Sequence, residues 1–242
     1  MQAANPSMVV LLPVYQPGDH LPTLMTELGR AAPGCHFVIV DDGSGPAAAE
    51  VLRQAGNLGG TVLRHPRNRG KGTALKTGFA YAAEHHPGLD VICADADGQH
   101  SVADIVRVAE RVHETGHTVL GVRRFAENVP LRSKVGNTVT QVLFRAATGR
   151  GVLDTQTGLR AYPGSLLGWL ATVPGERFEY EMNVLLAAAR AGHPIEQVVI
   201  TTTYLDENAS SHFSPLSDSA RIYWPLLRYA AAALLTPARA TR

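Results

Sequence analysis

Short apolar runs alternate with helical patterns along the first half of the chain. Five of these runs are rich in valine, isoleucine and leucine: residues 8–13, 36–41, 61–65, 91–95 and 118–122. Several are almost entirely apolar, as expected of parallel strands that are covered on both faces. Between them, apolar residues recur at helical spacing, for instance at Leu21, Leu24, Met25 and Leu28. This alternation predicts an α/β fold with a mainly parallel sheet, right-handed crossovers and flanking helices.

Two further helices are predicted in the same half of the chain. Residues 74–83 form one of them. Ser101 has the character of an N-cap for the other, because Asp104 follows three residues later. The buried stripe of that helix is Ile105, Val108, Ala109 and Val112.

The alternation stops after residue 122. The elements expected beyond it are a helix over Leu131–Thr148, turns over residues 154–163, a helix over Glu179–Ala191, a β-rich run over residues 195–204, a polar loop over residues 205–217 and a helix over residues 220–235. No repeat or interdomain linker is evident. We therefore expect one α/β domain over residues 1–217, followed by a C-terminal helical elaboration over residues 218–242.

The composition is that of an ordinary globular protein. Of the 242 residues, 45% are hydrophobic and 18% are charged, and the net charge of +1 gives no sign of a nucleic-acid partner. Cys35 and Cys93 are far apart, so we expect two buried thiols in a reduced, cytoplasmic protein. We expect neither a signal peptide nor a membrane span, because no leader pattern and no apolar run of about 18 residues is found.

Two of the predicted strands end in acidic residues. Asp41 and Asp42 follow one strand, and Asp95 and Asp97 follow another. Acids in such places can simply cap turns, and Asp42 with the next two residues is open to that interpretation. Asp95 and Asp97 are two positions apart, so on an extended backbone their carboxylates would face the same way. Two such oxygen ligands suit Mg²⁺ or Mn²⁺, which complete their shell with substrate phosphates and water.

A glycine-rich basic segment, residues 67–73, follows the third strand and opens a helix. Cations and N–H groups at a helix N-terminus can bind an anion, and we place Lys71 among the donor-binding residues. A solvated basic turn is the alternative. The segment matches neither the P-loop nor the dinucleotide-binding fingerprint.

Arginines are concentrated between residues 123 and 160. The basic residues there are Arg123, Arg124, Arg132, Lys134, Arg145, Arg150 and Arg160, against only Glu127 and Asp154. Arg145 and Arg150 are the first candidates for solvated helix-face charges. The others could form a second anion site beside the metal.

Taken in order, these motifs resemble the inverting glycosyltransferases of family 2, which have a GT-A fold. The resemblance is greatest to the branch of dolichyl-phosphate and polyprenyl-phosphate mannosyl- and glucosyltransferases. It rests on segments that cover roughly the first two-thirds of the chain: residues 12–15, 40–44, 68–72, 95–100, 121–125, 132–137 and 154–160.

The resemblance implies a role for each site residue. Pro13, Tyr15, Asp41 and Asp42 would line the pocket for the base and ribose of a GDP- or UDP-linked sugar. Asp95 would lie near the ribose and the metal, and Asp97 and Gln99 would be metal ligands. Arg123 and Arg132 would bind phosphate in the acceptor region. One departure concerns Tyr15-Gln16-Pro17, because the branch often has Tyr-Asn-Glu there, which puts a contact usually made by the glutamate in doubt.

The acceptor can be argued from chemistry. A hydroxyl acceptor needs a general base, whereas a phosphate monoester, with a second pKa of about 6, is already largely a dianion and needs cations instead. The arginines therefore favour a lipid phosphate. Glu181 could be a base for a hydroxyl, but we favour a role in which it holds basic side chains.

The C-terminal helix mixes aromatic and basic residues. It could rest on the cytoplasmic face of a membrane that contains the lipid acceptor, or it could pack on the core. Other functions also remain: the same donor chemistry with a glycan or small-molecule hydroxyl, or a binding module without catalysis. A sugar nucleotidylyltransferase is disfavoured, because its glycine-rich loop after the first strand is missing.

Overall fold

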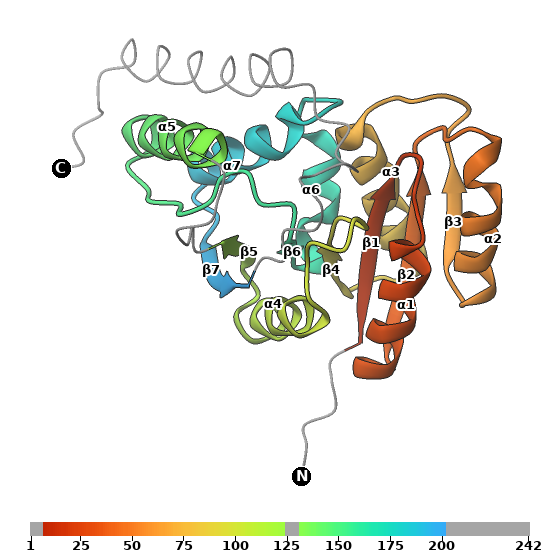
Figure 1. Ribbon diagram of the computed structural model, residues 1–242. Helices are drawn as coiled ribbons and strands as arrows, with labels where there is room; N and C mark the ends of the chain where they lie inside the picture. The colour runs from red at the N-terminus through yellow and green to blue at the C-terminus, as the bar shows by residue number, and fades with distance from the viewer. Residues whose placement is uncertain (1–6, 124–130, 202–242) are drawn as a thin grey trace.

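The computed structural model describes residues 7–123 and 131–201 of the chain (Figure 1). Its strands are β1 (Met8–Val14), β2 (Cys35–Asp41), β3 (Thr61–Arg64), β4 (Asp90–Cys93), β5 (Thr118–Arg123), β6 (Arg160–Tyr162) and β7 (Ile195–Ile200). Its helices are α1 (His20–Ala31), α2 (Ala49–Asn57), α3 (Lys71–His85), α4 (Val102–Thr115), α5 (Leu131–Thr148), α6 (Leu167–Thr172) and α7 (Glu179–Ala191). Short 3-10 turns at Pro46–Ala48 and Gly164–Leu166 lead into α2 and α6.

The strands form one mixed sheet in the order β3-β2-β1-β4-β6-β5-β7. Neighbouring strands are parallel except at β6, which runs antiparallel to both β4 and β5. The chain builds outward from β1 to β2 and β3, and then returns to place β4 on the other side of β1. Ligands of such sheets bind beyond the carboxyl ends of the strands at this reversal, so the residues that follow β1, β2 and β4 converge there.

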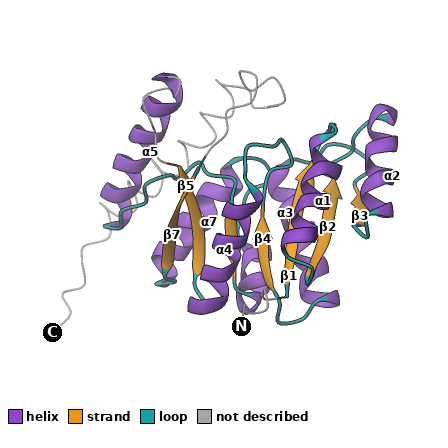
Figure 2. Ribbon diagram, turned by 60° about the horizontal axis from the view of Figure 1, so that its bottom comes forward, coloured by secondary structure: helices purple, strands orange, loops and turns teal. Residues whose placement is uncertain are grey.

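Helices cover both faces of the sheet (Figure 2). Val10 and Leu12 of β1 belong to a core shared with α1, α2 and α4. Val9 and Leu11, which point the other way, belong to a core shared with α3, α6 and α7. The nearly continuous apolar run of β1 therefore reflects burial on both faces, as the sequence predicts.

Most of the predicted elements are present with small shifts at their ends. The helices Leu131–Thr148 and Glu179–Ala191 have the predicted bounds. Ser101 caps α4, because its hydroxyl oxygen accepts a hydrogen bond from the backbone N–H of Asp104. Three elements were not predicted: α2, α6 and β6. The three-residue strand β6 lies in a segment predicted as turns, and its polar Arg160 hides the strand pattern.

The cysteines are unpaired, and only one is fully buried. Cys93 is buried, whereas Cys35 at the start of β2 is partly exposed. The prediction of a buried thiol is therefore confirmed for Cys93 and wrong for Cys35. Among the described helices, none combines the length and the apolar character that a bilayer crossing requires. The predicted polar loop, the predicted C-terminal helix and the boundary at residue 217 lie outside the described residues.

Candidate active site

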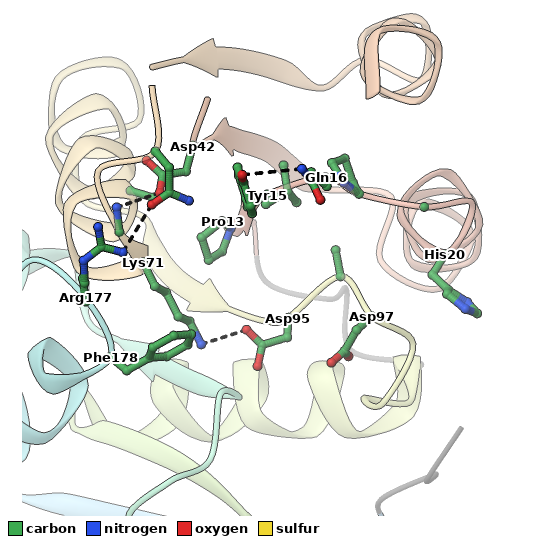
Figure 3. Close-up of a pocket in the computed structure, with 17 residues that line it drawn as sticks. Pro13, Tyr15, Gln16, His20, Asp42, Lys71, Asp95, Asp97, Arg177 and Phe178 are labelled. Atoms are coloured by element: carbon green, nitrogen blue, oxygen red, sulfur yellow. Dashed lines mark hydrogen bonds and ion pairs between the residues drawn. The ribbon is translucent and has the colours of Figure 1, made fainter. Parts of the chain in front are cut away.

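A cavity of about 570 Å³ opens at the carboxyl ends of the central strands. Its wall includes Pro13 and Tyr15 from β1 and the turn after it, Asp42 after β2, Lys71 at the start of α3, and Asp95 and Asp97 after β4 (Figure 3). Six of the predicted site residues therefore meet in one place. Pockets for small molecules commonly have volumes of about 300–1,000 Å³, so the cavity can hold a ligand of nucleotide size.

Asp95 and Asp97 lie in the bend that follows β4. The strand ends at Cys93, so the extended backbone predicted for the two acids is wrong, although both carboxylates reach the cavity. The Asp95 carboxylate packs directly against Gly158, where an added Cβ atom would overlap it. The glycine of the 154–160 segment is therefore required by the close approach of this loop to Asp95.

Among the described residues, Lys71 is the cation in direct contact with Asp95. Its Nζ lies 2.8 Å from Asp95 Oδ1 and 3.2 Å from Glu181 Oε2. Burial alone would lower the pKa of Lys71, but the Asp95 and Glu181 carboxylates outweigh it and raise the pKa above its ordinary value. Figure 3 shows the ammonium pointing at Asp95. The cavity floor therefore carries a fixed positive charge.

The two acids differ in their electrostatics. Burial opposes ionisation of Asp95, but Lys71 and His100 hold the pKa of its carboxyl below the usual range. Burial, followed by the charge of Asp95, raises the pKa of Asp97. A cation beside the pair would stabilise the ionised form of Asp97.

The donor set fits a hard divalent cation held together with substrate. No group of three or more His, Cys, Asp or Glu side chains suited to a metal occurs among the described residues. The protein would thus supply the two carboxylates, and substrate phosphates and water would complete the shell, as is usual for Mg²⁺. Gln99 lies just outside the cavity wall, and its backbone N–H donates to Asp97 Oδ1 at 3.1 Å. Its role as a third ligand stays a prediction.

The predicted anion site at the start of α3 is filled by the carboxylate of Asp42, a residue of the protein itself. Its Oδ1 accepts a hydrogen bond from the N–H of Arg69 at 2.9 Å, and its Oδ2 accepts one from the N–H of Gly70 at 2.7 Å. The N–H of Thr73 donates to the carbonyl oxygen of Glu176. Residues 67–73 therefore serve the cavity mainly through the Lys71 side chain.

Asp41 lies outside the cavity wall, against the prediction. Its buried Oδ1 accepts from the N–H of Ser44 at 2.9 Å, and its Oδ2 lies 3.8 Å from Arg64 Nε. The side chain braces the turn after β2.

Ser44 accepts a hydrogen bond from the N–H of Gln16 at 2.7 Å. This contact holds Gln16 at a φ of 52°, a conformation that costs a non-glycine residue about 1–2 kcal/mol.

The arginines of the acceptor region have specific partners. Asp154, fully buried, accepts from Arg123 Nε at 2.6 Å and from Arg123 Nη2 at 3.1 Å. Arg160 is also buried and donates to the carbonyl oxygens of Thr157, Glu181 and Thr155. Arg160 therefore stabilises the core and is not part of an open anion site, which corrects the prediction for this residue.

Two other arginines of the 123–160 segment differ in their exposure. Arg145 is exposed on α5, as predicted. Arg150 is partly buried and donates to the carbonyl oxygen of His193 at 2.7 Å, so it is not simply a solvated charge. Arg132 belongs to the first turn of α5, and its side chain lies outside the described part of the chain.

Comparison with known proteins identifies the family. The profile described as glycosyl transferase family 2 matches residues 9–166, which include every cavity residue from β1, β2, α3 and the acidic bend. The chain belongs to glycosyltransferase family 2.

Relatives of this family 2 glycosyltransferase include enzymes named for lipid phosphates. A polyprenol monophosphomannose synthase of Mycolicibacterium smegmatis is 27% identical over 81% of this chain and 77% of its own length. A UDP-N-acetylglucosamine–dolichyl-phosphate N-acetylglucosaminyltransferase of Methanococcus voltae is 30% identical over 71% of this chain and 76% of its own.

Solved structures confirm the GT-A fold. Glucosyl-3-phosphoglycerate synthase from Mycobacterium tuberculosis, solved with Mn²⁺, UDP and glucosyl-3-phosphoglycerate, has a TM-score of 0.67 at 17% identity, over 96% of this chain and 81% of its own. A mannosyltransferase from Pyrobaculum calidifontis, solved with GDP-mannose and Mn²⁺, has a TM-score of 0.56 at 17% identity, over 98% of this chain and 76% of its own.

The family 2 glycosyltransferase has cavity residues that the sequence did not reveal. Arg177 and Phe178, which immediately precede α7, line the cavity beside Lys71. Arg177 is exposed, and its Nη1 lies 3.4 Å from Asn68 Oδ1. The close approach of α7 to α3 brings them there, at Gly72, where an added Cβ atom would meet Tyr180 at 2.5 Å. No local pattern around Arg177 indicates this contact.

Proposed function

We propose that this glycosyltransferase transfers a hexose from a GDP- or UDP-linked sugar to a polyprenyl phosphate, with inversion and with Mg²⁺ or Mn²⁺. The observation that carries the proposal is the arrangement of Asp95, Asp97 and Lys71 in the cavity at the strand-order reversal. Two carboxylates and a partly buried ammonium are suited to a diphosphate that arrives with a cation. The names of the relatives supply the acceptor class.

In the proposed reaction, an oxygen of the acceptor phosphate attacks the anomeric carbon of the sugar. The bond from that carbon to the nucleoside diphosphate breaks, and its electron pair leaves with the diphosphate. A bound divalent cation would neutralise the charge on this leaving group. Lys71 places a second positive charge beside the same acids, and Pro13, Tyr15 and Asp42 would form the wall for the base and ribose.

Glu181 supports a phosphate acceptor over a hydroxyl acceptor. Its Oε2 lies 3.2 Å from Lys71 Nζ and its Oε1 lies 3.6 Å from Arg160 Nε, so both carboxylate oxygens face cations. This geometry favours a role in holding Lys71 over that of a general base. A phosphate dianion needs no base, whereas a hydroxyl does.

The acceptor phosphate is assigned to Arg123 and Arg132. Asp154 fixes the Arg123 guanidinium through two of its nitrogens, which would orient it for a second anion. Residues 1–217 would form the catalytic domain, and residues 218–242 would contact the membrane surface that holds the lipid.

The test is a donor screen on the full chain with Mn²⁺ or Mg²⁺ and a polyprenyl phosphate. GDP-mannose, UDP-glucose and UDP-N-acetylglucosamine are supplied separately, and lipid-linked sugar is measured by mass spectrometry. One donor is expected to give a product that chelation with EDTA abolishes. A product that persists without any divalent cation would contradict the metal assignment, and absence of product with every donor would contradict the proposal.

A further inference from the structure

A buried histidine lies directly behind the wall of the donor cavity. His65 follows β3, and the structure places it outside the cavity lining and 8% exposed. Its Nδ1 lies 2.7 Å from Asp42 Oδ1, and its Nε2 lies 3.0 Å from Thr77 Oγ1 on α3. The ring thus connects the end of β2 to the body of α3.

Each ring nitrogen of His65 has a specific partner. On the Nε2 side, Thr77 Oγ1 also donates to the carbonyl oxygen of Thr73 at 3.0 Å. On the Nδ1 side, the Asp42 carboxylate also accepts from the N–H groups of Arg69 and Gly70. Because a carboxylate accepts hydrogen bonds, Nδ1 is the donor in its contact with Asp42.

We propose that His65 is a positioning residue for the sugar-nucleotide donor, whose Nδ1–H fixes Asp42 and, through it, the cavity wall. Asp42 holds Arg69 and Gly70 by their backbone, and the same short segment presents Asn68 and Lys71 to the cavity. The hydrogen bond from His65 orients Asp42 between these N–H groups. This inference rests on the proposed function, because it assigns His65 to donor binding.

Two substitutions test the contacts of the two ring nitrogens separately. His65→Asn keeps a donor where Nδ1–H lies and so retains the bond to Asp42, while it loses Thr77. His65→Gln places its amide where Nε2–H lies, retains Thr77 and loses Asp42. Asparagine removes more volume than glutamine from the same buried position, so a larger loss in His65→Gln reports on the hydrogen bonds and not on packing.

The experiment is calorimetry of GDP and UDP binding in the presence of Mn²⁺, with thermal melting of each variant alongside. His65→Gln is expected to weaken binding of the preferred nucleotide about tenfold or more, since it removes a hydrogen bond to a carboxylate. His65→Asn is expected to stay within about threefold of the wild type. In turnover assays, the loss in His65→Gln should appear in KM for the donor and leave kcat nearly unchanged.

The outcomes that would overturn the inference are distinct. Equal affinity in all three proteins, or equal losses in both variants, would show that the Asp42 bond does not set donor binding. Nitrogen NMR of the labelled wild type should show a proton on Nδ1 of His65, and an Nδ1 without a proton would contradict its role as the donor to Asp42. If the wild type binds no nucleotide, the proposed function is wrong, and so is the role of His65. If nucleotide binding is unchanged by His65→Gln, only the role of His65 is wrong.

Discussion

At the scale of single residues, the site is organised around the unequal pair Asp95 and Asp97. Lys71 lies 2.8 Å from Asp95 and stabilises its charge, whereas burial and the charge of Asp95 raise the pKa of Asp97. One acid is therefore electrostatically satisfied by the protein itself. The other is held in an unfavourable charged state, which a ligand of opposite charge would relieve.

We predict that Asp97→Asn stabilises the metal-free protein while it removes activity. A carboxyl whose pKa is raised on folding lowers stability as the pH rises through that pKa, so ionised Asp97 is destabilising at neutral pH. Differential scanning fluorimetry at pH 7.5 without divalent cations should show a melting temperature about 2–4 °C higher. Turnover should fall at least about 100-fold. A variant that is less stable than the wild type and equally active would contradict both statements.

Glu181→Gln tests the acceptor class at the same scale. If Glu181 positions Lys71, the substitution leaves a neutral side chain of the same shape, and kcat should fall less than about tenfold. If Glu181 is a general base for a hydroxyl, kcat should fall by about 10²–10⁴. Steady-state kinetics with the identified donor distinguish the two, and Glu84→Gln, exposed on α3 and outside the cavity wall, is the control.

Those site residues that lie in a recognisable local sequence pattern could be predicted from the sequence. Acids after an apolar strand and a lysine in a glycine-rich turn can be found without a structure, and Asp42, Lys71, Asp95 and Asp97 do line the cavity. Asp41 follows the same apolar strand as Asp42, but its carboxylate accepts a hydrogen bond from the N–H of Ser44 and does not line the cavity. This difference depends on the side-chain rotamer, which the sequence does not show. Arg177 could not be found, because only the packing of α7 on α3 brings it to the cavity.

At the scale of elements, two glycines allow the close approaches that build the site. Gly158 lets the loop before β6 pass against Asp95, and Gly72 lets α3 approach α7 at Tyr180. The approach at Gly158 follows from the arrangement of the sheet: β6 pairs with β4, so the loop that leads into β6 must cross the acidic bend. The strand β6, one of the elements that sequence patterns missed, is thus the one that positions Gly158.

We predict that Gly158→Ala displaces Asp95 and lowers activity at least about tenfold, together with a lower melting temperature. The control is Gly168→Ala in α6, where a Cβ atom would meet nothing within 4 Å. That change should leave activity intact and stabilise the protein by up to about 1 kcal/mol, because it reduces the freedom of the unfolded chain. Equal behaviour of the two variants in fluorimetry and turnover assays would contradict the assignment of Gly158.

At the scale of the whole molecule, the fold was predictable because the strand–helix alternation is strong. The apolar strands of the first half indicate a parallel sheet with helices on both faces, and the structure confirms it. The second half was harder, because β6 and α6 are only three and six residues long. Short elements have too few residues to show a period, and their position depends on long-range pairing.

Contact of the full chain with a membrane is a further prediction at this scale. Reversing two charges, Arg221→Glu with Arg228→Glu, should weaken co-sedimentation with anionic vesicles roughly tenfold or more, since a basic residue near such a surface contributes about 1 kcal/mol. Turnover of a short, water-soluble isoprenyl phosphate should be unchanged. Vesicle binding that is equal in the variant and the wild type would contradict a basic membrane-facing segment.

The most direct test of the proposed reaction compares two acceptors that differ only in the phosphate. The wild-type protein is incubated with Mn²⁺, the preferred nucleotide sugar and either a polyprenyl phosphate or the matching polyprenol, and hexosyl lipid is measured by mass spectrometry. We predict a hexosyl-phosphoryl lipid from the phosphate and at least about 100-fold less product from the alcohol, because the protein supplies cations in place of a base. Comparable or greater transfer to the polyprenol would contradict the account.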